Sequence, residues 1–191
     1  MELRQLAHFV AVAEELHFTR AAALACAAAD AQLDVAFIDG PTDPARVTRI
    51  DIGHDDLILT VPRGDPLAQR TSIRLDDPAL RELSFVDYRA DSALHAQIDA
   101  ACAAAGLARR TICEAQNMQY LTELVQQGLG VSILPPMSLR AVTPQVRAVQ
   151  ITPPLRRDLC AVIAAGHPPT GAAQALLDLR HGHQPPAAHG S

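Results

Sequence analysis

Short apolar segments alternate with capped helical segments along most of this chain, and this alternation limits the folds that it can adopt. Two units are clearest: a strand at 84–88 with a helix through 105, and a strand at 110–113 with a helix through 127. In each unit a polar residue stands at the start of the helix and a glycine follows its end. Strands and helices at this spacing predict an α/β fold with a mostly parallel sheet flanked by helices.

Other segments fit the same organisation. Apolar or alternating runs predict further strands, and one late run predicts a helix. In chain order the strands are expected at 33–38, 46–52, 57–62, 131–135, 146–151 and 158–165, and the helix at 171–180. The residues from Gly53 to Asp56 are expected to form a solvated turn between two strands. The Pro/His/Ala-rich residues 181–191 are expected to be a disordered tail.

The composition favours a packed protein of one domain or two small ones. The chain has 191 residues, of which 49% are hydrophobic and 3% aromatic, so Ala, Leu, Val and Ile must build the core. Its 16 basic residues are all arginine, and with 21 acidic residues the formal charge is −5. The longest apolar run, Ala21 to Ala29, is too short to cross a membrane. With no apolar signal segment at the N-terminus, we expect a cytoplasmic protein without a membrane partner.

The motifs of an enzyme or a metal site are missing from this sequence. The four cysteines form no C-x-x-C pair, so we expect them to be small buried hydrophobes rather than metal ligands or a redox pair. Gly128 and Gly130 follow a helix instead of a strand, so they do not form a nucleotide-binding fingerprint. No nucleophile stands beside a base in a known motif. We therefore expect no catalysis, no metal and no cofactor.

Two helix starts bring polar residues to one edge of the predicted sheet. Tyr88 ends one predicted strand, with Arg89 and Ser92 just after it, and Gln116 and Asn117 follow the next strand. In open α/β sheets, ligands bind beyond the carboxyl ends of the strands, where helix N-termini present free N–H groups. An arginine there can hold a carboxylate through two hydrogen bonds. These five residues are candidates for binding a small polar metabolite; the alternative is that Ser92 and Asn117 only cap their helices.

Five segments carry a combination of residues typical of one family. They are LRQLAHFVAVAEELHFTRAA at 3–22, LDVAFIDG at 33–40, DDLILTVPRGDPLA at 55–68, LSFVDYR at 83–89 and LTELVQQGLGVSILP at 121–135. The first resembles the start of the winged helix-turn-helix of LysR-type bacterial transcription regulators, and the others resemble that family's effector domain. The resemblance implies a two-lobed, periplasmic-binding-protein-like fold that binds a small organic effector, in a regulator that is a homo-oligomer when intact.

Part of the family pattern is missing from this chain. In the family a recognition helix, a wing, a linker helix and the first units of effector lobe I follow the second helix, whereas here an alanine-rich stretch leads directly into LDVAF. We infer an internal deletion or a mis-joined gene model. The expected parts are a truncated helix-turn-helix at 1–22, a junction at 23–32, remnants of lobe I at 33–45 and 146–180, lobe II at 46–145, and a tail at 181–191.

Specific DNA binding is not expected of this chain. The resemblance places Thr19 and Arg20 near the DNA backbone, but residues 1–32 contain only two arginines against four acidic residues. Sequence-independent DNA affinity comes mainly from basic contacts to phosphates. The sequence therefore predicts a truncated LysR-type regulator with an effector-binding domain and impaired or absent DNA binding. The alternatives are a cytoplasmic solute-binding protein of the same fold and, less favoured, a small α/β enzyme.

Overall fold

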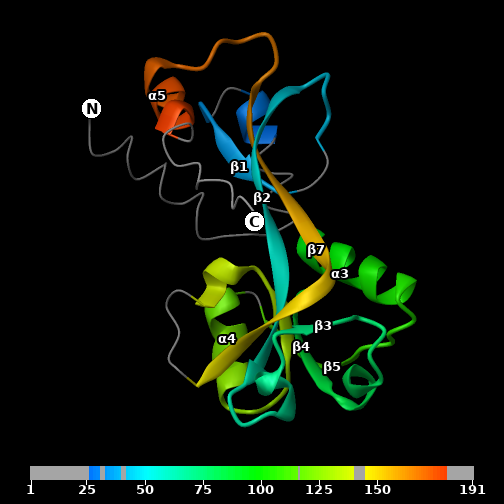
Figure 1. Ribbon diagram of the computed structural model, residues 1–191. Coiled ribbons are helices and arrows are strands. Elements are labelled where there is room, and N and C mark those ends of the chain that lie inside the picture. Colours follow the sequence, from blue (N-terminus) through cyan, green and yellow to red (C-terminus); the bar gives the residue numbers. More distant parts are fainter. Residues whose placement is uncertain (1–25, 31–32, 40–41, 116, 140–144, 180–191) are drawn as a thin grey trace, which may run out of the picture.

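Two long strands connect two unequal lobes. The computed structural model describes residues 26–30, 33–39, 42–115, 117–139 and 145–179, and the statements below concern these residues. Strands β2 (Val47–Pro62) and β7 (Val146–Ala164) run antiparallel along each other through both lobes (Figure 1). The smaller lobe, at the top of Figure 1, contains β1 (Ala36–Ile38) and α5 (Gly171–Leu179), and we call it the upper lobe.

The long pair of strands, which we call the β2/β7 ribbon, differs from the sequence prediction. The segments 46–52 and 57–62 belong to one strand, with register shifts between Asp51 and Gly53 and between Leu57 and Ile58. The expected solvated turn at 53–56 is therefore wrong. Asp55 and Asp56 lie opposite Arg157 and Arg156 on β7, and opposite charges on facing strands stabilise the pairing. The segments 146–151 and 158–165 are likewise joined into one strand.

The lower lobe contains the remaining strands and helices. They are η1 (Pro66–Gln69), β3 (Ser72–Ile73), η2 (Pro78–Glu82), β4 (Ser84–Tyr88), α3 (Ala93–Ala104), β5 (Arg110–Ala115), α4 (Met118–Gln126), β6 (Ser132–Leu134) and η3 (Pro136–Leu139), where η denotes a 3-10 helix. Figure 1 shows α3 and α4 on opposite sides of the strands. The predicted α/β class is thus confirmed.

The expectation of a mostly parallel sheet is wrong for these strands. β4 pairs with β5 in parallel, and a parallel bridge joins Phe85 of β4 to Val131 just before β6. β3 also pairs with β7 in parallel, but β1–β7, β2–β6 and the long β2–β7 ladder are antiparallel. The five-stranded sheet of β1, β7, β2, β6 and β3 is therefore mixed, and β4 and β5 form a separate parallel pair. β5 also carries one extra residue, Ile112, between the pairs formed by Thr111 and Cys113.

The apolar core of the lower lobe joins both helices to the sheet. Leu94 and Ile98 of α3, Leu121 and Val125 of α4, and Phe85 of β4 are all 2% exposed or less and belong to one cluster. The predicted helix caps are confirmed: the side chains of Ser92 and Asn117 accept hydrogen bonds from the first turns of α3 and α4. Glycines with positive φ follow both helices, as the sequence indicates.

The upper lobe has two small apolar clusters, one on each face of β7. Alternation along the strand sends Cys160 and Val162 to one face and Ala161 and Ile163 to the other, where they meet α5. Meanwhile Val146, Val149 and Ile151 at the start of β7 pack in the core of the lower lobe, while Val47 at the start of β2 packs in the upper lobe. The β2/β7 ribbon therefore contributes residues to the apolar clusters of both lobes.

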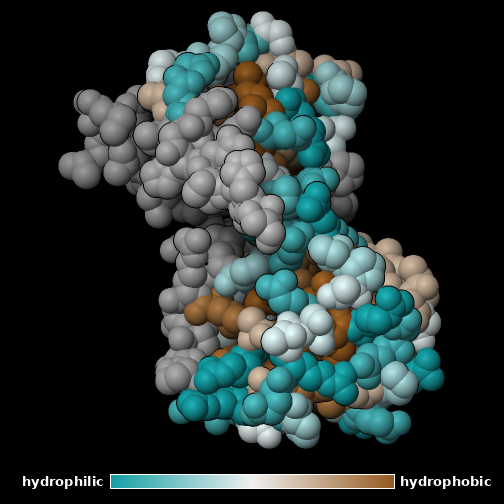
Figure 2. Space-filling view, viewed as in Figure 1, coloured by the Kyte–Doolittle hydropathy of each residue, from teal (hydrophilic) through white to brown (hydrophobic). Residues whose placement is uncertain are grey.

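The part of the chain that the structure describes contains no helix that is both long and apolar enough to cross a membrane. The visible face of the lower lobe is largely hydrophilic, with smaller apolar areas between polar residues (Figure 2). The most exposed large hydrophobic side chains among the described residues are Ile112, Tyr120 and Leu129, all of them in this lobe.

Close contact between the turn after α4 and β4 gives a test of this packing. A Cβ atom at Gly130 would lie 2.6 Å from the Ser84 carbonyl oxygen, which is backbone and cannot move aside easily. We expect Gly130→Ala to lower the free energy of unfolding by about 1–3 kcal/mol in urea denaturation. Gly64→Ala is the control, because a Cβ there meets no atom within 4 Å, and it should change stability by less than about 0.5 kcal/mol.

Candidate functional site

The carboxyl ends of β4 and β5 lie next to each other, and α3 and α4 begin just beyond them. Tyr88 and Ala115 form the last register pair of the two parallel strands. Beyond that pair, the backbone N–H of Ala90 donates to the Glu114 carboxylate at 3.3 Å. This hydrogen bond holds the segment after β4 against the end of β5. The two sets of polar residues that the sequence predicted as one site therefore come from the ends of adjacent strands.

Two of the five predicted effector-binding residues present polar groups at the surface. The Arg89 side chain is 41% exposed, and its guanidinium donates to the Asp91 carboxylate at 2.6 Å. Asn117 is exposed and uses its side-chain oxygen to cap α4, accepting from Gln119 N–H at 2.6 Å. A guanidinium beside a helix N-terminus is an arrangement suited to anionic groups.

The other predicted effector-binding residues differ in position. Ser92 is buried, and its hydroxyl accepts a hydrogen bond from the N–H of His95 at 3.0 Å. In this structure Ser92 therefore acts as the N-cap of α3. Tyr88 is 5% exposed, and burial raises the pKa of its hydroxyl above the usual value although the nearby Arg157 opposes the rise. Its phenol therefore stays protonated at neutral pH. Gln116 lies outside the described residues.

A surface groove of about 840 Å³ adjoins the same strand end. Glu114 and Ala115 at the end of β5 line it, together with Tyr120, Glu123, Leu124, Gln126 and Gln127 of α4 and the turn after it. The four described candidate residues do not line this groove. It runs along α4, whereas Arg89 and Asp91 lie on the segment that leads into α3. The groove and the candidate site therefore share only the end of β5.

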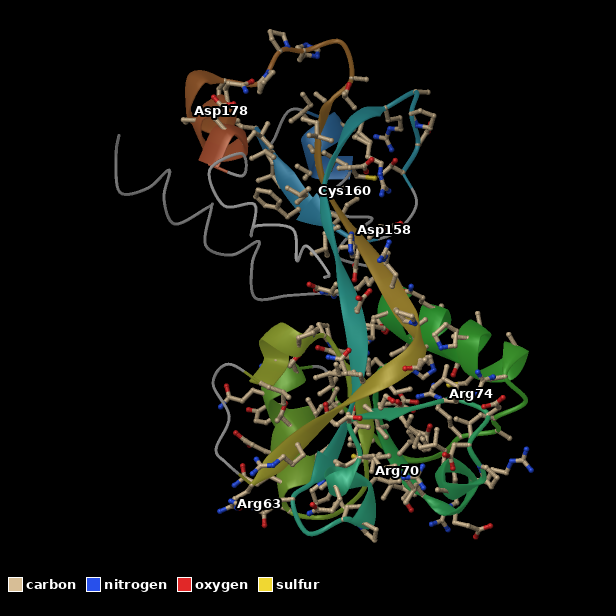
Figure 3. All side chains as sticks on the ribbon, in the orientation of Figure 1. Arg63, Arg70, Arg74, Asp158, Cys160 and Asp178 are labelled. Atoms are coloured by element: carbon tan, nitrogen blue, oxygen red, sulfur yellow. The ribbon has the colours of Figure 1, made fainter. Side chains whose placement is uncertain are left out.

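A buried arginine at the junction of the lobes was not predicted from the sequence. Arg157 of β7 is 2% exposed and donates to Asp55 of β2 at 2.5 Å and to Asp39, just after β1, at 3.3 Å. Figure 3 labels the next β7 residue, Asp158, and Cys160 at the level where the ribbon enters the upper lobe. The positive charge of Arg157 also lowers the pKa of the Tyr88 hydroxyl at the end of β4, against the larger effect of burial. Arg157 thus connects the end of β1, the ribbon and the surroundings of the candidate site.

A second charged network, centred on Arg109, joins β4, β5 and α3. The guanidinium of Arg109 is 4% exposed, and it donates to the carboxylates of Asp87 and Asp99 while stacking over the Phe85 ring. The hydroxyl of Thr111 donates to Asp87 at 2.6 Å. These contacts join α3 to both strands that carry the candidate residues, so they fix the strand ends relative to α3.

The four cysteines are free; Cys102 and Cys160 are buried as the sequence predicts, whereas Cys113 is only partly buried. Burial raises the pKa of the Cys102 thiol to about 11 and also raises the pKa of Cys160. For Cys26 the expectation of burial is wrong, because this residue is exposed beside the Arg46 guanidinium at 3.4 Å. Within the described ranges, no three His, Cys, Asp or Glu side chains converge in a way that could hold a metal. Thr19 and Arg20 lie outside these ranges.

The fold is similar to that of several solved effector-binding domains. The effector-binding domain of QuiR in complex with shikimate has a TM-score of 0.70 and 21% identity, with 81% of this chain and 73% of that chain covered. The regulatory domain of Synechocystis PCC6803 CcmR in complex with 2-PG has a TM-score of 0.74 and 16% identity, with coverage of 94% and 88%. These likenesses show a two-lobed, periplasmic-binding-protein-like fold.

Sequence comparisons identify the family. The model of the LysR substrate binding domain matches residues 4–184, and the chain belongs to this family of transcriptional-regulator domains. A Bacillus subtilis protein described as the uncharacterized HTH-type transcriptional regulator YwbI is 26% identical over 127 residues, which are 66% of this chain and 42% of that protein. A Mycobacterium avium probable hydrogen peroxide-inducible genes activator is 33% identical over 104 residues, 54% and 33% of the two chains. The chain spans less than half the length of these relatives.

Replacing Arg157 tests whether the junction of the lobes depends on its charge. Arg157→Met leaves the nearly buried Asp39 carboxylate without its cation, so we expect the free energy of unfolding to fall by about 3–5 kcal/mol. Arg156→Met is the matched control, because this neighbour is 56% exposed and lies 3.5 Å from Asp56, and it should cost less than about 1 kcal/mol. Equal losses from the two variants in chemical denaturation would contradict this role of Arg157.

Thiol labelling tests the assignment of the cysteines. At pH 7.5 we expect Cys26 to react rapidly with a disulfide reagent. Cys102 should react only when the protein unfolds, because its raised pKa leaves about one thiol in a thousand or fewer as thiolate and its sulfur is enclosed. Peptide mapping of the labelled protein, with and without denaturant, measures both. Rapid labelling of Cys102 in the native protein would show that α3 does not pack as described.

Proposed function

We propose that this chain binds a small polar organic metabolite at the adjoining ends of β4 and β5. The observation that carries the proposal is the position of the exposed Arg89 guanidinium on the segment between β4 and α3. The hydrogen bond from the Ala90 N–H to Glu114 holds this segment against β5. Arg89 and Asn117 would contact the ligand. Tyr88 and Ser92 would shape the site from within the protein, and Gln116 is retained as a candidate from the sequence.

The ion pair between Arg89 and Asp91 is compatible with a ligand carboxylate. Both side chains are 41% exposed, so water screens their attraction and the pair is weak. A ligand carboxylate can accept hydrogen bonds from two N–H groups of the guanidinium at once. The contact with Asp91 is a single hydrogen bond. The binding of shikimate and of 2-PG by the two similar domains supports a small-molecule ligand of this general size.

We further propose that the chain is a truncated regulator. Its relatives are described as transcriptional regulators, and in this chain an alanine-rich stretch leads directly into LDVAF, where the family has its recognition helix. With residues 1–22 as a remnant of the DNA-binding domain, the chain would lack specific DNA binding, catalyse no reaction and act in the cytoplasm. In the intact family a change of lobe arrangement on effector binding would alter the oligomer on DNA, which requires different effector affinities for the two arrangements.

A thermal-shift screen of organic acids tests the proposed site. We expect at least one acid to raise the melting temperature of the wild-type chain, with its dissociation constant weakened roughly tenfold or more in Arg89→Ala because a bidentate contact is lost. Arg81→Ala is the control. This arginine is exposed in the last turn of η2, before the start of β4 and not at its carboxyl end, so its replacement should leave binding unchanged.

Asn117 needs a variant that separates binding from capping. Asn117→Ala removes both the cap of α4 and the amide group, whereas Asn117→Ser keeps a capping oxygen and removes only the amide. If Asn117 contacts the ligand, both variants weaken binding, but only the alanine variant lowers the stability of the free protein. Binding that survives both Arg89→Ala and Asn117→Ser would place the ligand elsewhere.

A further inference from the structure

The groove along α4 has a lining that the proposed metabolite site does not use. It measures about 840 Å³, and it is lined by the end of β5, by one side of α4 and by the turn after this helix. Tyr120 lies in the first turn of the helix, and Glu123 and Leu124 lie in the second. Gln127 is the C-cap residue. Because these positions are three or four residues apart, their side chains share one face of α4.

The charged side chains in this lining are both carboxylates. Glu114 accepts a hydrogen bond from the Ala90 N–H at 3.3 Å, and Glu123 accepts one from the Gln119 side chain at 3.1 Å. Neither donor carries a charge. Within the described part of the chain, no arginine forms an ion pair with Glu114 or Glu123. The groove therefore presents negative charge that those residues do not neutralise.

The groove also contains an aromatic ring and aliphatic surface. Tyr120 is 60% exposed, so much of its ring is open to solvent. The face of an aromatic ring attracts ammonium and guanidinium groups. Ala115 and Leu124, which are both partly buried, add aliphatic surface to the same lining. An organic cation with a carbon chain is complementary to this combination, whereas an inorganic cation gains nothing from the aliphatic surface.

The dipole of α4 distinguishes the two ends of the groove. The N-terminus of the helix, which follows the end of β5, carries partial positive charge and opposes a cation. Glu114 at this end carries a full negative charge. The C-terminus of the helix carries partial negative charge, and Glu123 lies in the last turn, so the carboxylate and the dipole both favour a cation there. The stronger of the two cation positions is therefore expected at Glu123.

We propose that this groove binds an organic cation of the diamine or guanidino-amine class. One cationic group lies against the Glu123 carboxylate and the ring of Tyr120, and the aliphatic chain lies along Leu124. The second cationic group lies near Glu114. This inference does not rest on the proposed function, because the metabolite site is built around the Arg89 guanidinium and takes an anion.

Putrescine is the probe, and the diol with the same carbon chain is its uncharged control. In a two-dimensional NMR titration of the full chain, we expect putrescine to shift the backbone N–H signals of Tyr120, Glu123 and Leu124 to saturation. The diol should leave these signals in place. Because the groove is open to solvent, the dissociation constant should rise several-fold when NaCl is increased from about 20 mM to about 200 mM.

Two substitutions test the two parts of the cation position. Glu123→Gln removes the charge but keeps an oxygen that accepts from Gln119, and it should weaken putrescine binding about three- to fivefold. Tyr120→Leu removes the ring but keeps an apolar side chain, and it should weaken binding about two- to fivefold. Glu82→Gln is the matched control. It makes the same charge change at an exposed glutamate of η2, which is not part of the groove lining, and should leave binding unchanged.

Each of the three replaced side chains is exposed, so the variants should fold like the wild type. Equal weakening in Glu82→Gln and Glu123→Gln would show that putrescine responds to the formal charge of −5 and not to the groove, which overturns the proposal. Equal signal shifts with the diol would overturn it as well. A second copy of the chain is the alternative occupant: a dimer in sedimentation that dissociates in Tyr120→Leu would also overturn the proposal. None of these variants replaces a residue of the metabolite site, so the two proposals can fail separately.

Discussion

The antiparallel pairing of β2 with β7 is the constraint on which the rest of the structure depends. These strands lie about a hundred residues apart in the chain, and their ladder extends from Val47 opposite Ala164 to Pro62 opposite Val146. Each lobe builds its core on one end of this ribbon. Arg157, at the middle of the ribbon, pairs with Asp55 of β2 and with Asp39, which follows β1. The relative placement of the lobes is therefore tied to the pairing of the strands.

The candidate site depends on this arrangement through β4. Its strand end carries Tyr88 and Arg89, and three sets of contacts fix it: the parallel ladder with β5, the network around Arg109, and the ring of His95. In each of these a polar or charged group is matched by a partner, so the strand end is ordered although it lies near the surface. A site built in this way has little freedom to rearrange around a ligand. Exposed side chains such as that of Arg89 can still change conformation to contact a ligand.

The sequence predicts those features that depend on local chemistry. The caps at Ser92 and Asn117 and the glycines after α3 and α4 follow from backbone geometry within a few residues, and the structure has them at these positions. The continuity of β2 through 53–56 was not predictable in this way, because these residues pair with a strand about a hundred residues away in the chain. The burial of Arg157 has the same origin. Its neighbours Arg156 and Asp158 gave no local sign that only the middle one of three charged residues faces inward.

The extra residue at Ile112 matters for how the chain behaves at high concentration. β5 pairs with β4 along one side, and among the described residues its other side has no strand partner. A regular edge strand of this kind would be a template for a strand from another molecule. The extra residue interrupts the even spacing of the N–H and C=O groups along this edge. The lower lobe is thereby protected against growing into an extended intermolecular sheet.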